Sequence, residues 1–405
     1  MNSPDADSAR VIIKKRRALP FFSGHPWVFA GAVHRVEGEP AAGAEVTVHA
    51  HDGKFIARGL INPQSNIRVR LYSWDESQRL DNEFWSRRIQ TAITHRHSLF
   101  GDAPEKRCCR LIFSEADGLS GVVVDRYNDH LLLQWTSRAL AEREPFFVEQ
   151  LHQQLQPAGI WRRTEKGMAE AEGLTLTDGL VTGAEPPRPL FVEEHGLQYG
   201  VDVVAGQKTG FYFDQRDNRM AAARYLRGRI LDLFCYSGGF GLTALRHGAA
   251  TQVLGVDSSQ PALDFAQRNA ELNSLADRMR FEQWAAYAKL ESLEKAGEQF
   301  DGVILDPPKM ARTRGGLERA LRGYFSLNQL AVRVLKPGGI LVTCSCSGLV
   351  SRGDFEQVLA RVASETGRTI QILESRGQAA DHPVSVQCLE NAYLKCLICR
   401  VDSRR

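Results

Sequence analysis

The chain has 405 residues, of which 43% are hydrophobic and 24% are charged, a balance typical of globular proteins with well-built cores. No apolar run approaches the roughly 18 residues that cross a bilayer, and the polar, acidic N-terminus is unlike a secretory signal. Eight cysteines are too few for a disulfide scaffold in a chain of this length, so we expect a cytoplasmic protein without a membrane anchor.

Residues 10–75 read as short strands separated by turn residues. Predicted strands cover residues 44–50, 55–60 and 67–72, and Asp52-Gly53 between the first two is typical of a tight hairpin turn. The pattern predicts a small β-barrel domain over residues 1–78. Trp27 fits either the core of this barrel or an exposed stacking face.

Positive charge gathers in this first domain. Between Arg10 and Arg70 there are ten Lys or Arg residues and four acidic ones, so this window carries twice the +3 net charge of the whole chain. A basic patch on a small β module is typical of phosphate binding, although a solvated basic surface has the same composition. The candidate RNA contacts are Lys14, Lys15, Arg16, Arg17 and, further along the chain, Lys208.

The next segment mixes helices and strands. A helical pattern runs from residue 82 to about residue 99, strands follow at 121–126 and 131–135, and a helix follows at 144–155. The proline cluster at 186–189 is typical of a linker. We therefore predict a small α+β domain over residues 79–188.

From residue 189 the chain alternates strands and helices. Apolar strands are predicted at 229–234, 251–256, 300–305 and 339–344, with helices such as 261–273 and 317–335 between them. The alternation predicts a Rossmann-like, doubly wound parallel sheet over residues 189–405. A last apolar segment, 392–401, reads as a strand. It contains Cys396 and Cys399, but a zinc site needs two further ligands at matching spacing, so we expect no metal.

A glycine-rich turn follows the first strand of the predicted sheet. Glycines there let the backbone approach a ligand closely, and the next strand ends in Asp257, where a ribose diol would be held. Dehydrogenases share such a turn, but two features favour S-adenosylmethionine. The carboxylate of Asp232 suits a cationic donor, and the Asp-Pro-Pro-Lys segment at 306–309 places Asp306 at the sheet edge where ligands bind.

Two cysteines lie at the carboxyl end of the predicted strand 339–344. Their spacing places Cys344 and Cys346 on one face, so geometry alone does not choose between them. A thiolate that adds to carbon 6 of a pyrimidine makes carbon 5 nucleophilic enough to take a methyl group. A lone buried cysteine is more often a small apolar side chain. The neighbouring donor loop and Asp306 favour catalysis here, and Cys346, nearer the loop, is the preferred nucleophile.

Several segments resemble the bacterial large-subunit (23S) ribosomal RNA cytosine-C5 methyltransferases of the methyltransferase I type. The resemblance covers nearly the whole chain, and residues 206–219 are its most specific part. It implies a PUA domain, a small middle domain and a class I S-adenosylmethionine-dependent methyltransferase domain that forms 5-methylcytosine. The segments that carry it are 25–29, 59–70, 115–126, 206–219, 381–384 and 393–395.

The resemblance also implies roles for single residues. Cys346, in a Ser-Cys-Ser-Gly motif, takes the place of the nucleophile, and Asp306 would orient the target base. It implies large-subunit ribosomal RNA as the partner and leaves a homodimer open. The residues assigned to the methyl donor are Gln215, Asp232, Phe234, Ser237, Gly238, Asp257, Ser258 and Asp306.

Two positions depart from the family pattern. Ala285 stands where the family often has an acidic residue near the adenine of the donor, which bears on donor affinity and on activity. Lys309 stands where another group of RNA cytosine-C5 methyltransferases has a second cysteine. The base that removes the carbon-5 proton is therefore unassigned, with Cys344 as one candidate. Two other functions stay open: methylation of another RNA atom or of a small molecule, and a catalytically silent RNA-binding role in ribosome assembly.

Overall fold

The computed structural model describes residues 9–204, 210–311 and 313–404, and these form two compact units. Unit 1 comprises the chain up to Leu190 together with Val203–Phe211 and Asp381–Asn391. Unit 2 comprises Phe191–Asp202, Tyr212–Ala380 and Ala392–Arg405. The division into three domains at residues 78 and 188 stays a prediction.

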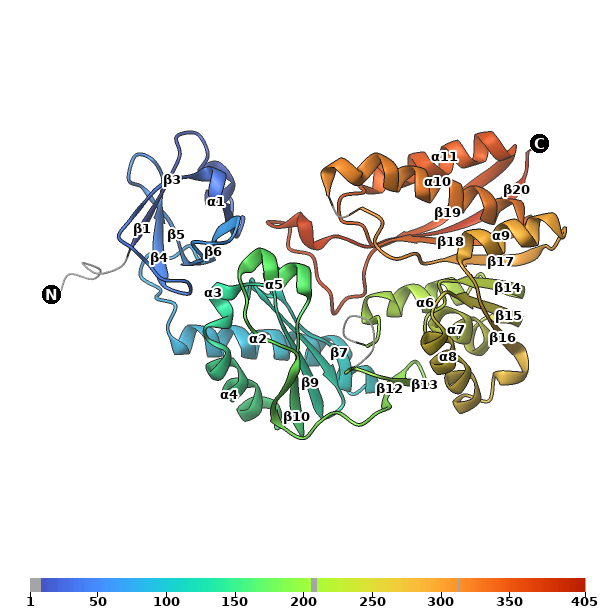
Figure 1. Cartoon of the computed structure of the whole chain (residues 1–405), viewed down its shortest axis with the longest axis horizontal. Helices are drawn as coiled ribbons and strands as arrows, with labels where there is room; N and C mark the ends of the chain where they lie inside the picture. The colour runs from blue at the N-terminus through green and yellow to red at the C-terminus, as the bar shows by residue number, and fades with distance from the viewer. Residues whose placement is uncertain (1–8, 205–209, 312, 405) are drawn as a thin grey trace. The chain divides into compact units, whose positions relative to one another are not determined.

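Unit 1 begins with a six-stranded sheet in the order β2-β6-β5-β4-β1-β3 (Figure 1). Most of its apolar side chains form one core, in which Val11, Val46 and Val69 are completely buried. Strands β4, β5 and β6 were predicted within two residues, whereas β1 to β3 were not. β1 and β2 have only four and three residues, and β3, although as long as β4, has no buried side chain. The strands are β1 (Arg10–Ile13), β2 (Trp27–Phe29), β3 (Val33–Glu37), β4 (Glu45–His49), β5 (Phe55–Ile61) and β6 (Ile67–Ser73).

A second sheet of unit 1 has the order β11-β10-β9-β8-β7. Helix α2 (Asn82–Phe100) begins where the Asp81 side chain accepts a hydrogen bond from the Phe84 N–H, and its apolar face packs on this sheet. Leu60 and Tyr72 of the first sheet belong to this second core, so these two side chains join the first sheet to it, while the rest of the first sheet keeps its own core. The remaining elements are α3 (Arg138–Ala141), α4 (Glu144–Leu155), α5 (Lys166–Glu172), β7 (Cys108–Phe113), β8 (Val122–Tyr127), β9 (His130–Trp135), β10 (Gly159–Arg163) and β11 (Gly179–Gly183).

Unit 2 is built on a seven-stranded sheet in the order β16-β15-β14-β17-β18-β20-β19. Five neighbouring strands are parallel, as predicted, but β20 is antiparallel to both β18 and β19. The predicted parallel sheet is therefore a mixed one. The strands are β14 (Arg227–Leu233), β15 (Ala249–Asp257), β16 (Met279–Gln283), β17 (Phe300–Leu305), β18 (Leu335–Ser345), β19 (Arg368–Arg376) and β20 (Lys395–Ser403).

Helices cover both faces of this sheet (Figure 1). α7 (Gly239–His247) and α8 (Gln260–Leu272) pack on one face. α9 (Ala286–Lys295), α10 (Leu317–Arg333) and α11 (Arg352–Thr366) bury the other face in one apolar cluster. The strand order brings the carboxyl ends of β14, β15, β17 and β18 to one edge, which is where ligands bind in such sheets. None of the helices in the described ranges is long and apolar enough to cross a membrane.

Candidate active site

The loop between β14 and α7 has an unusual backbone. Phe234 and Tyr236 have φ values of 61° and 49°, and Gly238 has a φ of 86°. Positive φ is uncommon for residues other than glycine and gathers at functional sites. At Gly241 an added Cβ would lie 2.7 Å from the Met279 side chain, so α7 can pack this closely on the sheet only with glycine there. The predicted donor loop is thus a tight turn held against the sheet.

Asp232 lies beneath this loop, at the end of β14, and is 1% exposed. Its Oδ2 accepts a hydrogen bond of 3.0 Å from the Gly241 N–H. Burial raises the pKa of Asp232 to about 8, and the nearby carboxylates of Asp306 and Asp257 act in the same direction. The carboxyl is therefore mostly protonated at neutral pH, and a cation bound nearby would favour its ionised form.

Asp257, at the end of β15, holds the loop from the other side. Its Oδ2 accepts from the Tyr236 N–H at 3.0 Å, and its Oδ1 accepts from the Ser259 N–H at 2.9 Å. Each carboxylate oxygen keeps a further lone pair that a ribose hydroxyl can use. Ser258 follows it and is exposed at the same edge.

Two further residues predicted to bind the donor, Ser237 and Gln215, have buried side chains. Ser237 is 4% exposed, and its carbonyl accepts from Asn269 Nδ2 at 3.1 Å. Gln215 is 3% exposed, and its Oε1 accepts from Asn218 Nδ2 at 2.7 Å. These bonds brace the loop and the start of α6 (Arg216–Ala223). Direct donor contacts by these two side chains stay a prediction.

A buried ion cluster fixes the segment that contains Gln215. Glu194 accepts two hydrogen bonds of 2.7 Å from Arg219 and one of 3.4 Å from Arg216, and all three side chains are at most 4% exposed. Glu194 ends β12 (Leu190–Glu194), the first strand of a hairpin with β13 (Leu197–Val201). This cluster gives part of the 206–219 motif a structural role. Lys208, a predicted RNA contact, lies outside the described residues.

The structure brings Asp306 and Cys346 to the same sheet edge. β17 ends at Leu305 and β18 at Ser345, so each residue comes directly after one of two paired parallel strands. Cys346 Sγ lies 3.8 Å from the Pro307 carbonyl oxygen. Cys346 is half-buried, whereas the other seven cysteines are buried.

Cys344 occupies a different environment from Cys346. It is fully buried within β18 and pairs across the sheet with Cys396 of β20. The hydrogen bond with Cys396 and burial together raise the pKa of the Cys344 thiol well above its usual value. Because β18 ends at Ser345, the two thiols do not share one continuous strand face. The structure therefore separates two cysteines that spacing alone left equivalent.

Ser347 connects the turn of Cys346 to the loop after Asp306. Its Oγ accepts from the Met310 and Ala311 N–H groups at 3.0 and 3.1 Å and lies 3.1 Å from the Tyr324 hydroxyl. In the sequence, only the cysteine of the Ser-Cys-Ser motif indicated a function. A serine that satisfies two backbone donors explains why this position is polar.

Two tyrosines that had no predicted role lie in the same region. The rings of Tyr212 and Tyr236 meet edge to face at 5.3 Å between centroids. Burial raises the pKa of Tyr212, and nearby negative groups, including Asp306 and Cys346, raise it further. Tyr212 therefore lies close to both proposed catalytic residues, and its ring can help enclose a planar base.

The two departures from the family pattern lie on exposed positions. Ala285 immediately precedes α9 and makes no side-chain capping hydrogen bond. Beside it the Trp284 side chain is 44% exposed, and the Trp284 backbone N–H donates to the Asp257 carbonyl at 3.0 Å. This bond ties the segment before α9 to the end of β15. Lys309 is also exposed.

The basic patch of unit 1 is smaller than its composition indicated. The run Lys14 to Arg17 is exposed, as expected of a phosphate-binding surface. Arg58 and Arg70 are instead buried, with ion pairs of 3.0 Å to Glu45 and 2.9 Å to Glu115. Only part of the positive charge in this window is therefore available to a polyanion.

Glu115 lies at the centre of a buried polar network in unit 1. It accepts hydrogen bonds of 2.9 Å from both Trp27 Nε1 and Arg70 Nη1, and one of 3.3 Å from Asn391 Nδ2. Trp27 is thus half-buried, with its indole N–H satisfied within the unit. Several family-like segments of unit 1 meet here, which gives them a structural role.

One group of side chains in unit 1 has the composition of a metal site. The ligand atoms of His25, Cys388 and Glu390 lie within 4.8 Å of one another. His25 Nδ1 accepts from the Trp27 N–H at 3.2 Å, so the proton of a neutral ring sits on Nε2 and points to Glu390 at 3.4 Å. This tautomer favours a hydrogen bond over metal ligation through Nε2. The expected absence of a metal stays a prediction.

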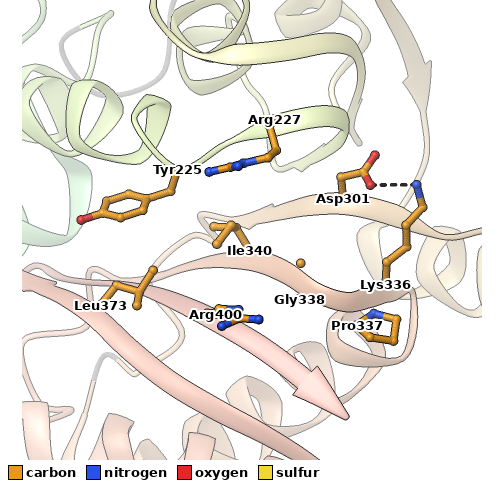
Figure 2. Close-up of a pocket in the computed structure, with 10 residues that line it drawn as sticks. Tyr225, Arg227, Asp301, Lys336, Pro337, Gly338, Ile340, Leu373 and Arg400 are labelled. Carbon is orange, nitrogen blue, oxygen red and sulfur yellow. Dashed lines mark hydrogen bonds and ion pairs between the residues drawn. The ribbon is translucent and has the colours of Figure 1, made fainter.

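Unit 2 also contains a cavity of about 420 Å³. Arg227, Asp301, Lys336 and Arg400 surround it (Figure 2). Arg227, Asp301 and Lys336 lie near the amino ends of β14, β17 and β18. The cavity therefore lies at the sheet edge opposite Asp257, Asp306 and Cys346 and is not the predicted donor site.

Comparison with known proteins identifies the family. Residues 11–74 match the PUA-like domain family, and residues 180–397 match the S-adenosylmethionine-dependent methyltransferase family. The chain is 41% identical over 396 residues to ribosomal RNA large subunit methyltransferase I of Escherichia coli O139:H28, covering 97% of this chain and 100% of that protein. It is also 41% identical over 400 residues to the protein of the same name from Photobacterium profundum, covering 96% and 99% of the two chains.

A solved structure agrees with the fold. A protein from Streptococcus mutans assigned as an S-adenosylmethionine-dependent methyltransferase superposes with a TM-score of 0.82 at 17% identity, over 96% of this chain and 99% of that one. Together with the family matches, this confirms the predicted PUA-like and methyltransferase folds and S-adenosylmethionine as the cofactor. The chain therefore belongs to the ribosomal RNA large subunit methyltransferase I family of S-adenosylmethionine-dependent methyltransferases.

Proposed function

We propose that this enzyme methylates carbon 5 of a cytosine in large-subunit ribosomal RNA, with Cys346 as a covalent nucleophile. The observation that carries the proposal is the position of Cys346. It is the half-buried thiol among eight cysteines, and it follows β18 directly beside Asp306 and Pro307. The names of the relatives, which specify large-subunit ribosomal RNA, support the choice of substrate.

The chemistry requires a temporary bond to the base. The Cys346 thiolate adds to carbon 6, and the electron pair displaced toward carbon 5 attacks the methyl carbon of the donor, whose bond to the sulfonium sulfur breaks so that S-adenosylhomocysteine leaves. A base then removes the proton at carbon 5, and the bond between sulfur and carbon 6 breaks to release 5-methylcytosine and the free thiolate. Asp306 can accept a hydrogen bond from the exocyclic amine of cytosine and so orient the ring. A carbon-5 transfer needs the thiol, whereas transfer to nitrogen does not.

The donor is proposed to bind over the loop that ends at Gly238. Asp257 would hold the ribose hydroxyls, because its oxygens face the loop and keep free lone pairs. In the proposed set Phe234, Asp257 and Asp306 are partly exposed, and Ser258 is exposed. Gln215, Asp232 and Ser237 would support the donor from the buried side.

The test is methylation by a Cys346→Ala variant. We expect methyl transfer to be abolished while donor and RNA binding persist, because the change removes only the covalent step. Mass mapping of ribosomal RNA from cells with and without the gene should reveal one missing methylated cytosine. RNA that carries 5-fluorocytosine should trap an adduct with the wild type but not with the variant, because fluorine cannot leave carbon 5 as a proton.

Normal methylation by Cys346→Ala would contradict the covalent mechanism and favour transfer to nitrogen. Failure of a donor titration would favour a catalytically silent RNA-binding role, for which Ala285 is the supporting feature. Ribosomal RNA as the partner supports a cytoplasmic location. A homodimer stays a prediction.

A further inference from the structure

We infer that Lys395 is a positioning residue for Cys346, and that its ammonium group stabilises the thiolate form of the nucleophile. The inference rests on the proposed function, because it concerns how the proposed nucleophile is activated. Lys395 begins β20, and the pairing of β20 with β18 places it opposite Ser345, the residue before Cys346. In the sequence, Lys395 stood out only as part of the 393–395 motif.

The contacts of Lys395 fix the turn that carries Cys346. The residue is only 4% exposed. Its Nζ donates to the Ser347 carbonyl at 2.7 Å and to the Tyr393 carbonyl at 2.9 Å. An ammonium group has three N–H donors, so these carbonyls leave one for an anion. Lys395 thus holds the backbone next to Cys346 and brings a positive charge to it.

The charges around Lys395 favour the Cys346 thiolate as the anion that takes the third N–H. Burial lowers the pKa of Lys395 to about 8, while negative charge on Cys346 raises it. Of the residues on α11, Asp354 raises this pKa and Arg352 lowers it. Carbonyl oxygens satisfy the hydrogen bonds of a buried ammonium but not its charge, which is costly to bury unpaired.

Two tyrosine side chains also interact electrostatically with Cys346. A phenol carries no positive charge, so neither can stabilise the thiolate as an ammonium group does. They belong to Tyr212 and Tyr324, and the carboxylate of Asp306 acts on the same two tyrosines. When the thiol ionises, the S–H bond breaks, sulfur keeps the electron pair and the proton passes to the buffer. The resulting thiolate forms an ion pair with Lys395.

The experiment follows the alkylation of Cys346 by iodoacetamide as a function of pH. It uses the full-length protein without RNA or donor, and mass spectrometry of the Cys346 peptide separates this thiol from the seven buried ones. Lys395→Met keeps the bulk of the side chain and removes the charge. We expect alkylation at pH 7 to slow roughly tenfold, and the profile to move about one pH unit upward.

Two further variants serve as controls. Lys395→Arg keeps the positive charge and should retain a profile close to that of the wild type. Lys336→Met removes an exposed lysine whose ion pair with Asp301, at 2.8 Å, lies at the opposite sheet edge, and it should leave the profile unchanged. Superimposable profiles for the wild type and Lys395→Met would overturn the inference.

A second measurement applies if Lys395→Met unfolds, which alkylation of the buried cysteines would reveal. Coupling between two titrating groups is reciprocal. The NMR titration of Lys395 should therefore have a lower midpoint in Cys346→Ser than in the wild type, and equal midpoints would overturn the inference. Neither measurement needs methyl transfer. The inference about Lys395 can therefore fail while Cys346→Ala still abolishes methylation. Conversely, the proposed function can fail while the titrations of Lys395 and Cys346 prove to be coupled.

Discussion

Among single residues, Asp232 is subject to two requirements that normally conflict, burial and negative charge. Its carboxyl must be buried beneath the donor loop to accept the Gly241 N–H, yet a cationic donor calls for negative charge. The fold meets the first demand and raises the pKa to about 8, so the charge is largely absent until a donor binds. Donor binding should therefore be coupled to release of the Asp232 proton.

This coupling predicts a pH dependence of donor affinity. Below pH 8 a bound cation must displace the proton, so affinity should rise from pH 6 to 8, by up to about tenfold per unit, and level off above. Asp232→Asn keeps the shape and an acceptor for Gly241, so it should remove this dependence and bind more weakly at pH 8. Calorimetry in two buffers of different ionisation enthalpy measures the released proton. Identical pH profiles for both proteins would exclude Asp232 from donor binding.

The Asp232 carboxyl also affects folding stability. Its contribution changes with pH in the opposite direction from that of an acid in a salt bridge. Its folded pKa lies above the ordinary value of 3.8, so the folded state retains a proton that the unfolded state releases. The contribution of Asp232 to stability therefore falls between pH 4 and 8. In the donor-free protein at pH 8, Asp232→Asn should melt at a temperature equal to or above that of the wild type. The same melting measurement shows whether the variant is folded.

At the scale of elements, α9 begins without the signals that usually start a helix. Ala285 occupies the N-cap with an extended backbone, makes no side-chain capping bond, and is followed by a first turn without acidic residues. The four first N–H groups of the helix are therefore left to solvent or to other partners. A change at this position acts both on the helix and on the sheet edge beside Asp257.

Ala285→Asp should stabilise the protein, because its carboxylate can accept from the first turn of α9 and meets the positive end of the helix dipole. The expected gain in the free energy of unfolding is about 0.5–2 kcal/mol, measured by denaturant titration. If the acid also bonds the adenine of the donor, donor affinity should rise several-fold. Ala285→Ser is the matched control, since it caps the helix without charge. Equal donor affinity in both variants would show that the change acts on the helix alone.

At the scale of the whole molecule, deletion of the PUA-like module is a poor test of its function. Arg70 and Tyr72 bind Glu115 and the Ser120 carbonyl within unit 1 at 2.9 and 2.5 Å. Removing the module would leave Glu115 buried without its cation, which typically costs about 3–5 kcal/mol. Neutralising exposed charges tests RNA binding without this damage.

Replacing Lys15, Arg16 and Arg17 with Gln should weaken RNA binding most at low salt. Every cation removed from a phosphate reduces the slope of log affinity against log salt by roughly 0.7–0.9, so the slope of the triple variant should fall by up to about 2–3. Filter binding over a salt series measures this slope. Arg35→Gln is the control, because Arg35 is exposed but already paired with Glu37 at 2.7 Å. An unchanged slope in the triple variant would assign the basic run another role.

Features that depend on local chemistry could be predicted from the order of the residues. Strand and helix periods located the principal elements of unit 2, and the glycine turn after Asp232 indicated the loop that we propose binds the donor, because turns and amphipathic faces are encoded within a few neighbouring residues. The family motifs carried the assignment of Cys346. Short strands such as β1 and β2 could not be predicted because they contain too few residues to show a period.

Features that depend on partners distant in the sequence become visible only in the folded chain. The antiparallel insertion of β20 beside β18 buries Cys344 against Cys396 and brings Lys395 to the turn of Cys346. Arg70, counted among free positive charges, is neutralised by Glu115, 45 residues away. Burial and pairing set the surroundings of each of these groups, and neither can be read from spacing along the chain.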